Sequence, residues 1–224
     1  TASVKQLDHV HQMMGHLRET VGNEIDIMVD FHGRPGSASS AIQFIKVLEP
    51  FNPLFVEEVI QPGDAALMKS IKDKINCPLA SGERLISFSE FEQHLSIRAL
   101  DIVQPDLCHC GGFTEAMRIG ALAAICGAGV APHNPLGPIA GVAALHYDIA
   151  TPNFIIQEQM NAVPWFYDVV EGQPEIIDGY WTLPDKPGLG IEVNETIAKK
   201  YPFKQEPVNI IQAAAIEDGT IVHW

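Results

Sequence analysis

Positive charge is scarce in this sequence. Its 224 residues include 14 Lys and Arg against 28 Asp and Glu, which gives a formal net charge of −14 at pH 7. This excess of negative charge repels nucleic acid and anionic membranes, so both are excluded as partners. The sequence also lacks an apolar run of 18 residues and a signal-peptide pattern. Its four cysteines show no disulfide framework, which favours the reducing cytoplasm as its location.

What the sequence does contain is a regular succession of short apolar runs, each ending in a carboxylate or an imidazole. The run ends follow one another at intervals of 27, 26, 23, 27 and 25 residues. That interval is the size of one strand plus one helical crossover. In a closed α/β barrel the carboxyl ends of the strands form the active-site face. The six end residues, which we expect to converge on one pocket, are Asp30, Glu57, Glu83, Asp106, His133 and Glu158.

The runs alternate with helical patterns over most of the chain. An amphipathic helix is predicted over residues 4–20 and a strand over 25–29. An eight-unit barrel takes about 250 residues, so we interpret the chain as the C-terminal part of a longer protein. Residues 1–160 are expected to form a partial (β/α) barrel. After Gln159 the rhythm stops, and residues 161–224 are expected to form a turn-rich C-terminal extension.

Three successive run ends are carboxylates, namely Asp30, Glu57 and Glu83. Carboxylates gathered around one point repel one another strongly in a low dielectric, so a divalent cation is their natural partner. All-oxygen ligation selects a hard ion, and Mg²⁺ keeps positions open for water or substrate. Acidic residues at strand ends can also cap a helix or face solvent, but three in register favour a metal site. We predict that these three residues hold one Mg²⁺ ion and lie close enough to share it.

Two histidines have a sequence context that indicates acid–base chemistry. His32 follows Asp30 by two residues, and extended backbone would turn both side chains to the same side. His133 ends the run after the one that ends at Asp106. A carboxylate bonded to one ring nitrogen fixes the tautomer and leaves the other nitrogen free as a base.

Residues 108–110 read CHC, but no second Cys/His pair follows to complete a zinc site.

Seven motifs, taken together and in order, resemble the enolase superfamily, within its mandelate racemase subgroup. They are DFHGR, PLFVEE, SGER, VQPD, APHNPLGPIA, QEQ and PDKPGLGIEV. The resemblance extends over essentially the whole chain. It implies a modified (β/α)7β-barrel, preceded by an N-terminal α+β capping domain and the first two barrel strands. It also implies that the C-terminal extension packs toward that capping domain.

The resemblance further implies a reaction and a role for each candidate residue. The reaction is the elimination of water from an aldonate, a small-molecule sugar acid, to give a 2-keto-3-deoxy sugar acid. Mg²⁺ acts as a Lewis acid on the substrate carboxylate, and a histidine base removes the neighbouring proton. The implied assignments are Asp30, Glu57 and Glu83 for Mg²⁺, His133 with Asp106 for the general base, His32 for the general acid, and Glu158 for a hydrogen bond to the enediolate.

Two other functions stay open at this stage. Two histidines on opposite sides of a substrate would equally suit 1,1-proton transfer, as in a racemase or epimerase of a 2-hydroxy acid. A non-catalytic protein could also use the barrel as a binding scaffold, since a fold alone never establishes activity. Within the pair Glu57-Glu58, the motif of the resembled family matches the first residue. We also expect the protein to form a homo-oligomer.

Overall fold

The computed structural model describes residues 2–160, 165 and 168–205. Its centre is a five-stranded parallel sheet with the strand order β1-β2-β3-β4-β5, so each strand lies beside its predecessor in the sequence. At least one helix separates each strand from the next, as the spacing of the apolar runs predicts. The strands are β1 (Val29–Asp30), β2 (Val56–Glu57), β3 (Leu79–Ser81), β4 (Ile102–Val103) and β5 (Gly129–Val130).

The helix predicted over residues 4–20 is confirmed, since α1 extends over Val4–Val21. Side-chain caps explain several of the starts: Asp64 caps α3, and Ser87 forms a capping box with Glu90 at the start of α4. No helix among the described residues is long and apolar enough to cross a membrane. The helices are α1 (Val4–Val21), α2 (Ala38–Leu48), η1 (Glu49–Phe51, a 3₁₀ turn), α3 (Ala65–Lys72), α4 (Phe88–Ser96), α5 (Gly112–Cys126), α6 (Pro138–Ala150) and α7 (Glu195–Ala198).

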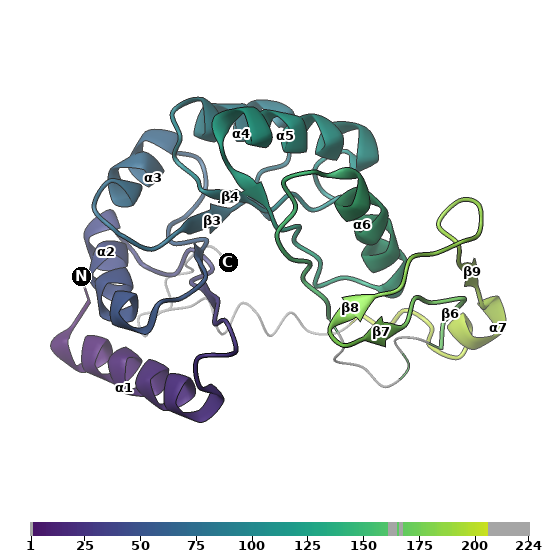
Figure 1. Ribbon diagram of the computed structural model, residues 1–224, viewed down its shortest axis with the longest axis horizontal. Helices are drawn as coiled ribbons and strands as arrows, with labels where there is room; N and C mark the ends of the chain where they lie inside the picture. The colour runs from purple at the N-terminus through teal and green to yellow at the C-terminus, as the bar shows by residue number, and fades with distance from the viewer. Residues whose placement is uncertain (1, 161–164, 166–167, 206–224) are drawn as a thin grey trace.

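The sheet curves into an arc with the helices on its outer side (Figure 1). Because all five strands are parallel, their carboxyl ends lie at one edge of the arc. The sixth apolar run continues this order, because Phe154 forms a parallel bridge with Val130 of β5. All six run ends therefore lie along the same edge of the sheet. The predicted α/β class, with the sheet of a partial (β/α) barrel, is confirmed.

The core lies between the sheet and the surrounding helices. Each of four successive helices contributes a side chain that is fully buried: Ile45 of α2, Ile71 of α3, Phe91 of α4 and Ile119 of α5. Burying one such side chain contributes about 1.5–3 kcal/mol. This one-sided burial holds each helix against the sheet. The register of the strands, and hence the direction of the side chains that follow them, is fixed by that packing.

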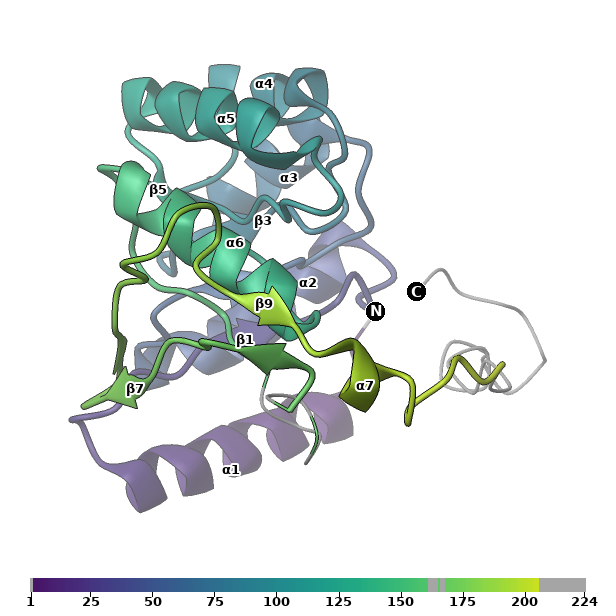
Figure 2. The same ribbon diagram turned by 90° about the vertical axis from the view of Figure 1, so that its right-hand side faces the viewer.

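Beyond residue 160 the regular alternation of strand and helix ends. Strand β6 (Val170–Glu171) pairs with β9 (Glu192–Val193), and β7 (Ile176–Ile177) forms a hairpin with β8 (Tyr180–Trp181). Figure 2 shows these short elements beside α6. Imidazole Nε2 of His146 on α6 lies 3.2 Å from the carbonyl oxygen of Leu189. Residues 206–224 of the expected extension lie outside the described part of the chain, and its packing toward a capping domain stays a prediction.

Candidate active site

The strand-end residues form one connected polar cluster. Asp30 and Glu57 are partners in the register of β1 and β2. His32 Nδ1 lies 3.0 Å from Asp30 Oδ2 and 3.6 Å from Glu83 Oε1. On the other side, His133 Nε2 lies 3.3 Å from Glu83 Oε2. Glu83 is only 7% exposed and stands between the two histidines, one on each carboxylate oxygen.

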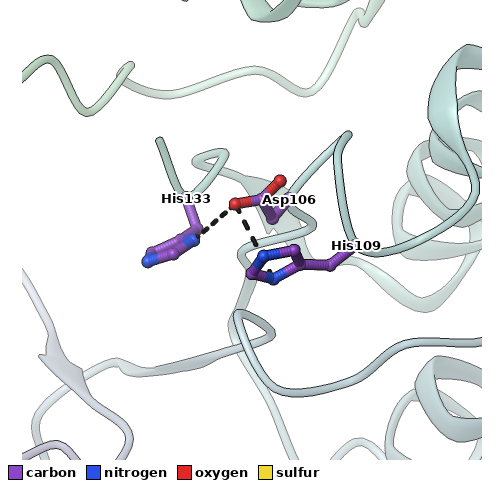
Figure 3. Close-up of side chains that lie close together, drawn as sticks. All are labelled: Asp106, His109 and His133. Atoms are coloured by element: carbon purple, nitrogen blue, oxygen red, sulfur yellow. Dashed lines mark hydrogen bonds and ion pairs between the residues drawn. The ribbon is translucent and has the colours of Figure 1, made fainter. Parts of the chain in front are cut away.

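His133 and Asp106 form the predicted pair. Nδ1 of His133 lies 2.8 Å from Oδ2 of Asp106, and the other oxygen of Asp106 accepts the backbone N–H of Cys108 at 2.7 Å. Figure 3 shows the imidazole of His133 directed at this carboxylate. The hydrogen bond to Asp106 assigns the Nδ1–H tautomer to neutral His133. Nε2 then remains as the basic nitrogen, on the side of Glu83.

The surroundings lower the pKa of Asp106 and raise the pKa of His133. Burial alone would raise the pKa of Asp106, but hydrogen bonds from His133 and Cys108 and the nearby imidazoles outweigh it and lower that pKa. Burial alone would lower the pKa of His133. The hydrogen bond to Asp106, with the charges of Glu158 and Glu83, outweighs it and raises that pKa. Asp106 therefore stays ionised, and His133 gains basicity.

The carboxylates repel one another as the sequence suggests. The pKa of Glu57 is raised to about 7, first by burial and then by the charges of Asp30, Glu83 and Glu158, against a hydrogen bond from Gln104. The pKa of Glu83 is also raised, mainly by burial. A divalent cation would relieve this repulsion and return both groups to the ionised state. The all-oxygen donor set therefore suits Mg²⁺.

The spacing of these carboxylates is wider than the sequence suggests. Among the described residues, the group of three potential ligands with donor atoms all within 4.8 Å of one another is Asp106, His109 and His133. Asp30, Glu57 and Glu83 do not form such a group, and the imidazole of His32 lies near both Asp30 and Glu83. Neither Cys108 nor Cys110 belongs to this closely spaced group of the described residues.

The structure separates the two members of the Glu57-Glu58 pair. Glu58 is 1% exposed, and its Oε2 accepts hydrogen bonds from Nε and Nη2 of Arg84 at 2.8 Å and 2.6 Å. Its Oε1 accepts from the Ser81 hydroxyl and, at 3.0 Å, from the backbone N–H of Gly82. This carboxylate is fully engaged in a buried ion pair. Glu57 is the member that faces the other site carboxylates.

The Glu58–Arg84 pair also supports the loop that carries His32. Nη1 of Arg84 donates to the side chain of Gln61 at 3.0 Å, and Gln61 in turn donates to the carbonyl oxygen of Gly33 at 3.0 Å. Gly33 has a positive φ of 66°, which favours glycine, and a Cβ atom there would lie 2.6 Å from Nη2 of Arg84 and displace the guanidinium. His32 itself has a positive φ of 52°, a conformation that surrounding contacts must hold.

Glu158 lies at the end of the sixth run, as predicted. Its Oε2 accepts the backbone N–H of Asn134 at 2.7 Å, and its carbonyl oxygen accepts the Asn134 side chain at 3.2 Å. No role was predicted for four residues that each contact a candidate residue, namely Asn134, Gln104, His109 and Arg84. The sequence signal that could have identified them is their position within or directly beside the strand-end motifs. The contacts of Asn134 with Glu158 and of Gln104 with Glu57 join residues 24 and 47 positions apart and required the fold.

This fold and cluster define an α/β domain with a carboxylate and histidine site at the strand ends. A sequence model of the family described as Enolase C-terminal domain-like matches residues 3–197, and the chain belongs to that family. The resemblance inferred from the motifs is thereby confirmed. Among solved structures, a mandelate racemase/muconate lactonizing enzyme from Jannaschia sp. CCS1 has a TM-score of 0.86 and 32% identity. That match covers 92% of this chain and 52% of the other.

Curated relatives share more of the sequence. D-galactonate dehydratase of Xanthomonas campestris pv. campestris (strain B100) is 40% identical over 99% of this chain and 59% of its own length. D-galactonate dehydratase of Pectobacterium atrosepticum is 35% identical over 98% of this chain and 59% of its own length. An enolase from Pantoea ananatis, solved with bound D-gluconate and Mg, is 30% identical with a TM-score of 0.83 over 90% of this chain and 49% of that one. The chain spans 59% of the length of these curated relatives.

Proposed function

We propose that the chain carries the catalytic residues of an Mg²⁺-dependent aldonate dehydratase, a hydro-lyase that acts on galactonate or a related sugar acid. The observation that carries this proposal is the placement of His133 and His32 on the two oxygens of Glu83, with Asp106 behind His133. It provides a base and an acid beside a cluster of carboxylates. The D-galactonate dehydratase relatives and the gluconate- and Mg-bound neighbour support the substrate class.

Asp30, Glu57 and Glu83 are the residues proposed to hold Mg²⁺. Their oxygen donors and the raised pKa values of Glu57 and Glu83 suit a hard dication. When bound, the ion supplies Lewis-acid stabilisation to the substrate carboxylate as charge develops on it.

His133 is proposed to start the reaction by taking the proton from C2 of the aldonate onto Nε2. The electron pair of that C–H bond then moves toward the carboxylate, forming an enediolate. Asp106 holds the tautomer and stabilises the imidazolium that forms, over the 2.8 Å contact at Nδ1. Glu158 is proposed to form a hydrogen bond with the developing enediolate.

His32 is proposed to complete the elimination as the general acid. It gives its proton to the C3 hydroxyl, the C3–O bond breaks, and the electron pair of the enediolate forms the C2–C3 double bond of an enol. Water leaves, and the enol tautomerises to the 2-keto-3-deoxy acid. A general acid of this kind typically contributes about 10²- to 10⁴-fold to the rate.

Racemisation or epimerisation of a 2-hydroxy acid is the second candidate, because His32 and His133 approach opposite oxygens of Glu83. In that reaction each histidine would exchange the C2 proton on one face. The substrate would need no hydroxyl at C3. Formation of a 2-keto acid therefore separates the two reactions.

The test is to incubate the protein with a panel of aldonates, with Mg²⁺ and with EDTA, and to measure 2-keto acid. We expect keto acid from at least one aldonate, only with Mg²⁺, and none from a His133→Asn variant. His16→Asn, which alters an exposed histidine on α1, is the matched control and should retain activity. Epimerised aldonate without keto acid would support the second candidate, and no conversion of any aldonate would contradict both.

We further propose residues 1–160 as the partial barrel that holds the site, and 161–224 as an extension that packs toward an N-terminal capping domain. A cytoplasmic location and a homo-oligomeric state complete the proposal. Co-expression with the N-terminal region of a dehydratase relative, followed by light scattering, tests both the docking and the assembly. A monomeric protein that does not associate with that region would contradict them.

A further inference from the structure

A second cavity lies apart from the carboxylate cluster, between helix α6, the sixth apolar run and the β7–β8 hairpin. Its volume is about 310 Å³, within the lower range of small-ligand pockets. The walls are mostly apolar. They are formed by Leu145 and Ile149 of α6, Phe154–Ile156, and Ile176, Tyr180 and Trp181 of the hairpin. Trp181 approaches α6 closely, since a Cβ atom at Gly141 would lie 3.0 Å from its ring.

Three residues that line this cavity carry four buried polar atoms without a hydrogen-bond partner in the described part of the chain. Both carboxylate oxygens of Asp148 are buried and unpartnered, and the residue is only 6% exposed. Oε1 of Gln157 and the indole Nε1 of Trp181 are also buried and unpartnered. Buried polar atoms are nearly always paired in native proteins, and leaving one unpaired costs about 1–3 kcal/mol. Four such atoms in one cavity point to a ligand.

The missing partner is not supplied by a basic residue of this chain. No Lys or Arg is among the residues lining the cavity. The residues outside the described part of the chain, 1, 161–164, 166–167 and 206–224, include no Lys or Arg in their sequence. The described lining of the cavity therefore supplies no lysine or arginine to pair with Asp148.

We propose that this cavity binds a guanidinium group carried on an apolar stem, as in an arginine side chain or an alkylguanidine. Guanidinium is planar, offers several N–H donors and suits the two oxygens of Asp148, with Gln157 as a third acceptor. It is also weakly hydrated, and aromatic walls such as Trp181 and Tyr180 attract cations. A divalent metal fits poorly, because Asp148 is the only carboxylate in the lining.

The indole N–H of Trp181 distinguishes between two sources of this group. It is a donor, so a guanidinium cannot satisfy it, whereas a carbonyl oxygen can. An arginine residue in a polypeptide carries such a carbonyl and a simple alkylguanidine does not. Tighter binding of a blocked arginine would indicate a polypeptide as the source. Equal or tighter binding of the alkylguanidine would indicate a small molecule.

Binding of the cation should be linked to a proton. Burial raises the pKa of Asp148 to about 8, so the empty cavity contains mostly the neutral acid at pH 7. The other titratable group in the lining is Tyr180 of the hairpin, and Tyr147, whose pKa is raised by burial, adjoins Asp148 on α6. Binding of a guanidinium favours the ionised form of Asp148, so the proton of this side chain is released. Affinity should therefore rise about tenfold per pH unit up to about pH 8 and then level off.

The experiment is calorimetric titration of the 224-residue chain with n-butylguanidinium and with N-acetylarginine methylamide. Asp148→Asn should weaken binding of both by about 10- to 100-fold. Asp185→Asn, which makes the same change of charge at an exposed site, should have no effect. Binding unaffected by Asp148→Asn, or no binding to the wild type, overturns the proposal. If Asp148→Asn does not fold, the wild-type pH dependence decides, and an affinity that stays constant between about pH 6 and pH 8 also overturns it.

Discussion

Nδ1 of His133 lies 2.8 Å from Oδ2 of Asp106, although 27 residues separate them in the sequence. The pair spans the ends of two neighbouring strands, and it leaves Nε2 of His133 directed at Glu83, 3.3 Å away. The contact with Asp106 thus determines both the tautomer and the ring orientation of His133, the proposed base. Its position explains why the pKa of Asp106 is lowered while that of His133 is raised.

Replacing Asp106 by Asn should lower the pKa of His133. The hydrogen bond and charge that raise this pKa are then lost, and burial, which lowers it, remains. NMR titration of the imidazole measures this directly. In the active protein the same variant should lose about 10²- to 10⁴-fold in turnover with its circular dichroism unchanged. Full activity, or an unaltered His133 pKa, would show the pair to be wrongly assigned.

Replacing His32 by Asn should separate proton exchange from elimination. If His133 alone removes the C2 proton, the variant stops losing water but still exchanges that proton with solvent deuterium. NMR of a competent aldonate in D₂O follows both events. Loss of exchange from only one C2 epimer, without keto acid from the wild type, would instead identify a two-base racemase.

The two neighbouring glutamates should respond oppositely to neutral substitution. Glu58→Gln breaks the buried ion pair with Arg84 and should destabilise the fold by about 3–5 kcal/mol. Glu57→Gln, measured without Mg²⁺, should stabilise it above pH 7. The pKa of Glu57 is raised to about 7 in the fold, so ionising it there costs up to about 3 kcal/mol. Urea denaturation measures both, and equal effects of the two variants would contradict the assignment.

Magnesium should raise the melting temperature of the protein through the strand-end carboxylates. A ligand that binds only the folded state stabilises it by about 2.7 kcal/mol at 100 times its dissociation constant. Glu83→Gln should abolish this shift, and EDTA should reverse it in the wild type. Asp185→Asn, which alters an exposed carboxylate, should leave it intact. A shift that survives in Glu83→Gln would place the ion elsewhere.

Asp148 should make the fold less stable as pH rises. Its folded pKa is raised from 3.8 to about 8 by burial, so the folded state binds a proton more tightly than the unfolded state. Below about pH 4 Asp148 is protonated in both the folded and the unfolded state, so its burial costs no stability. Above that pH the loss of folding stability grows through neutral pH, and it levels off above about pH 8. Asp148→Asn should therefore stabilise the protein by a few kcal/mol near pH 8, and little near pH 4. Thermal melts across this range test it, with Asp185→Asn as the control.

The repeating layout could be predicted from sequence because it is encoded locally. Apolar spacing and caps such as Ser87 with Glu90 determine where each helix begins, independently of distant residues. The interval between run ends predicted parallel strands, and hence that Asp30, Glu57, Glu83, Asp106, His133 and Glu158 belong to one edge. The strand lengths were less predictable, since β1 pairs over only Val29–Asp30 instead of residues 25–29.

What only the tertiary structure decided is which way each side chain points and what it meets. Glu57 and Glu58 are adjacent and chemically alike, yet Glu58 turns to a guanidinium 26 residues further on while Glu57 joins the carboxylate cluster. The position of His32 between Asp30 and Glu83 likewise depends on contacts among separate strands. The buried carboxylate of Asp148 has no local signature at all. Periodicity along a chain specifies elements, whereas electrostatics and burial arise only when distant elements pack together.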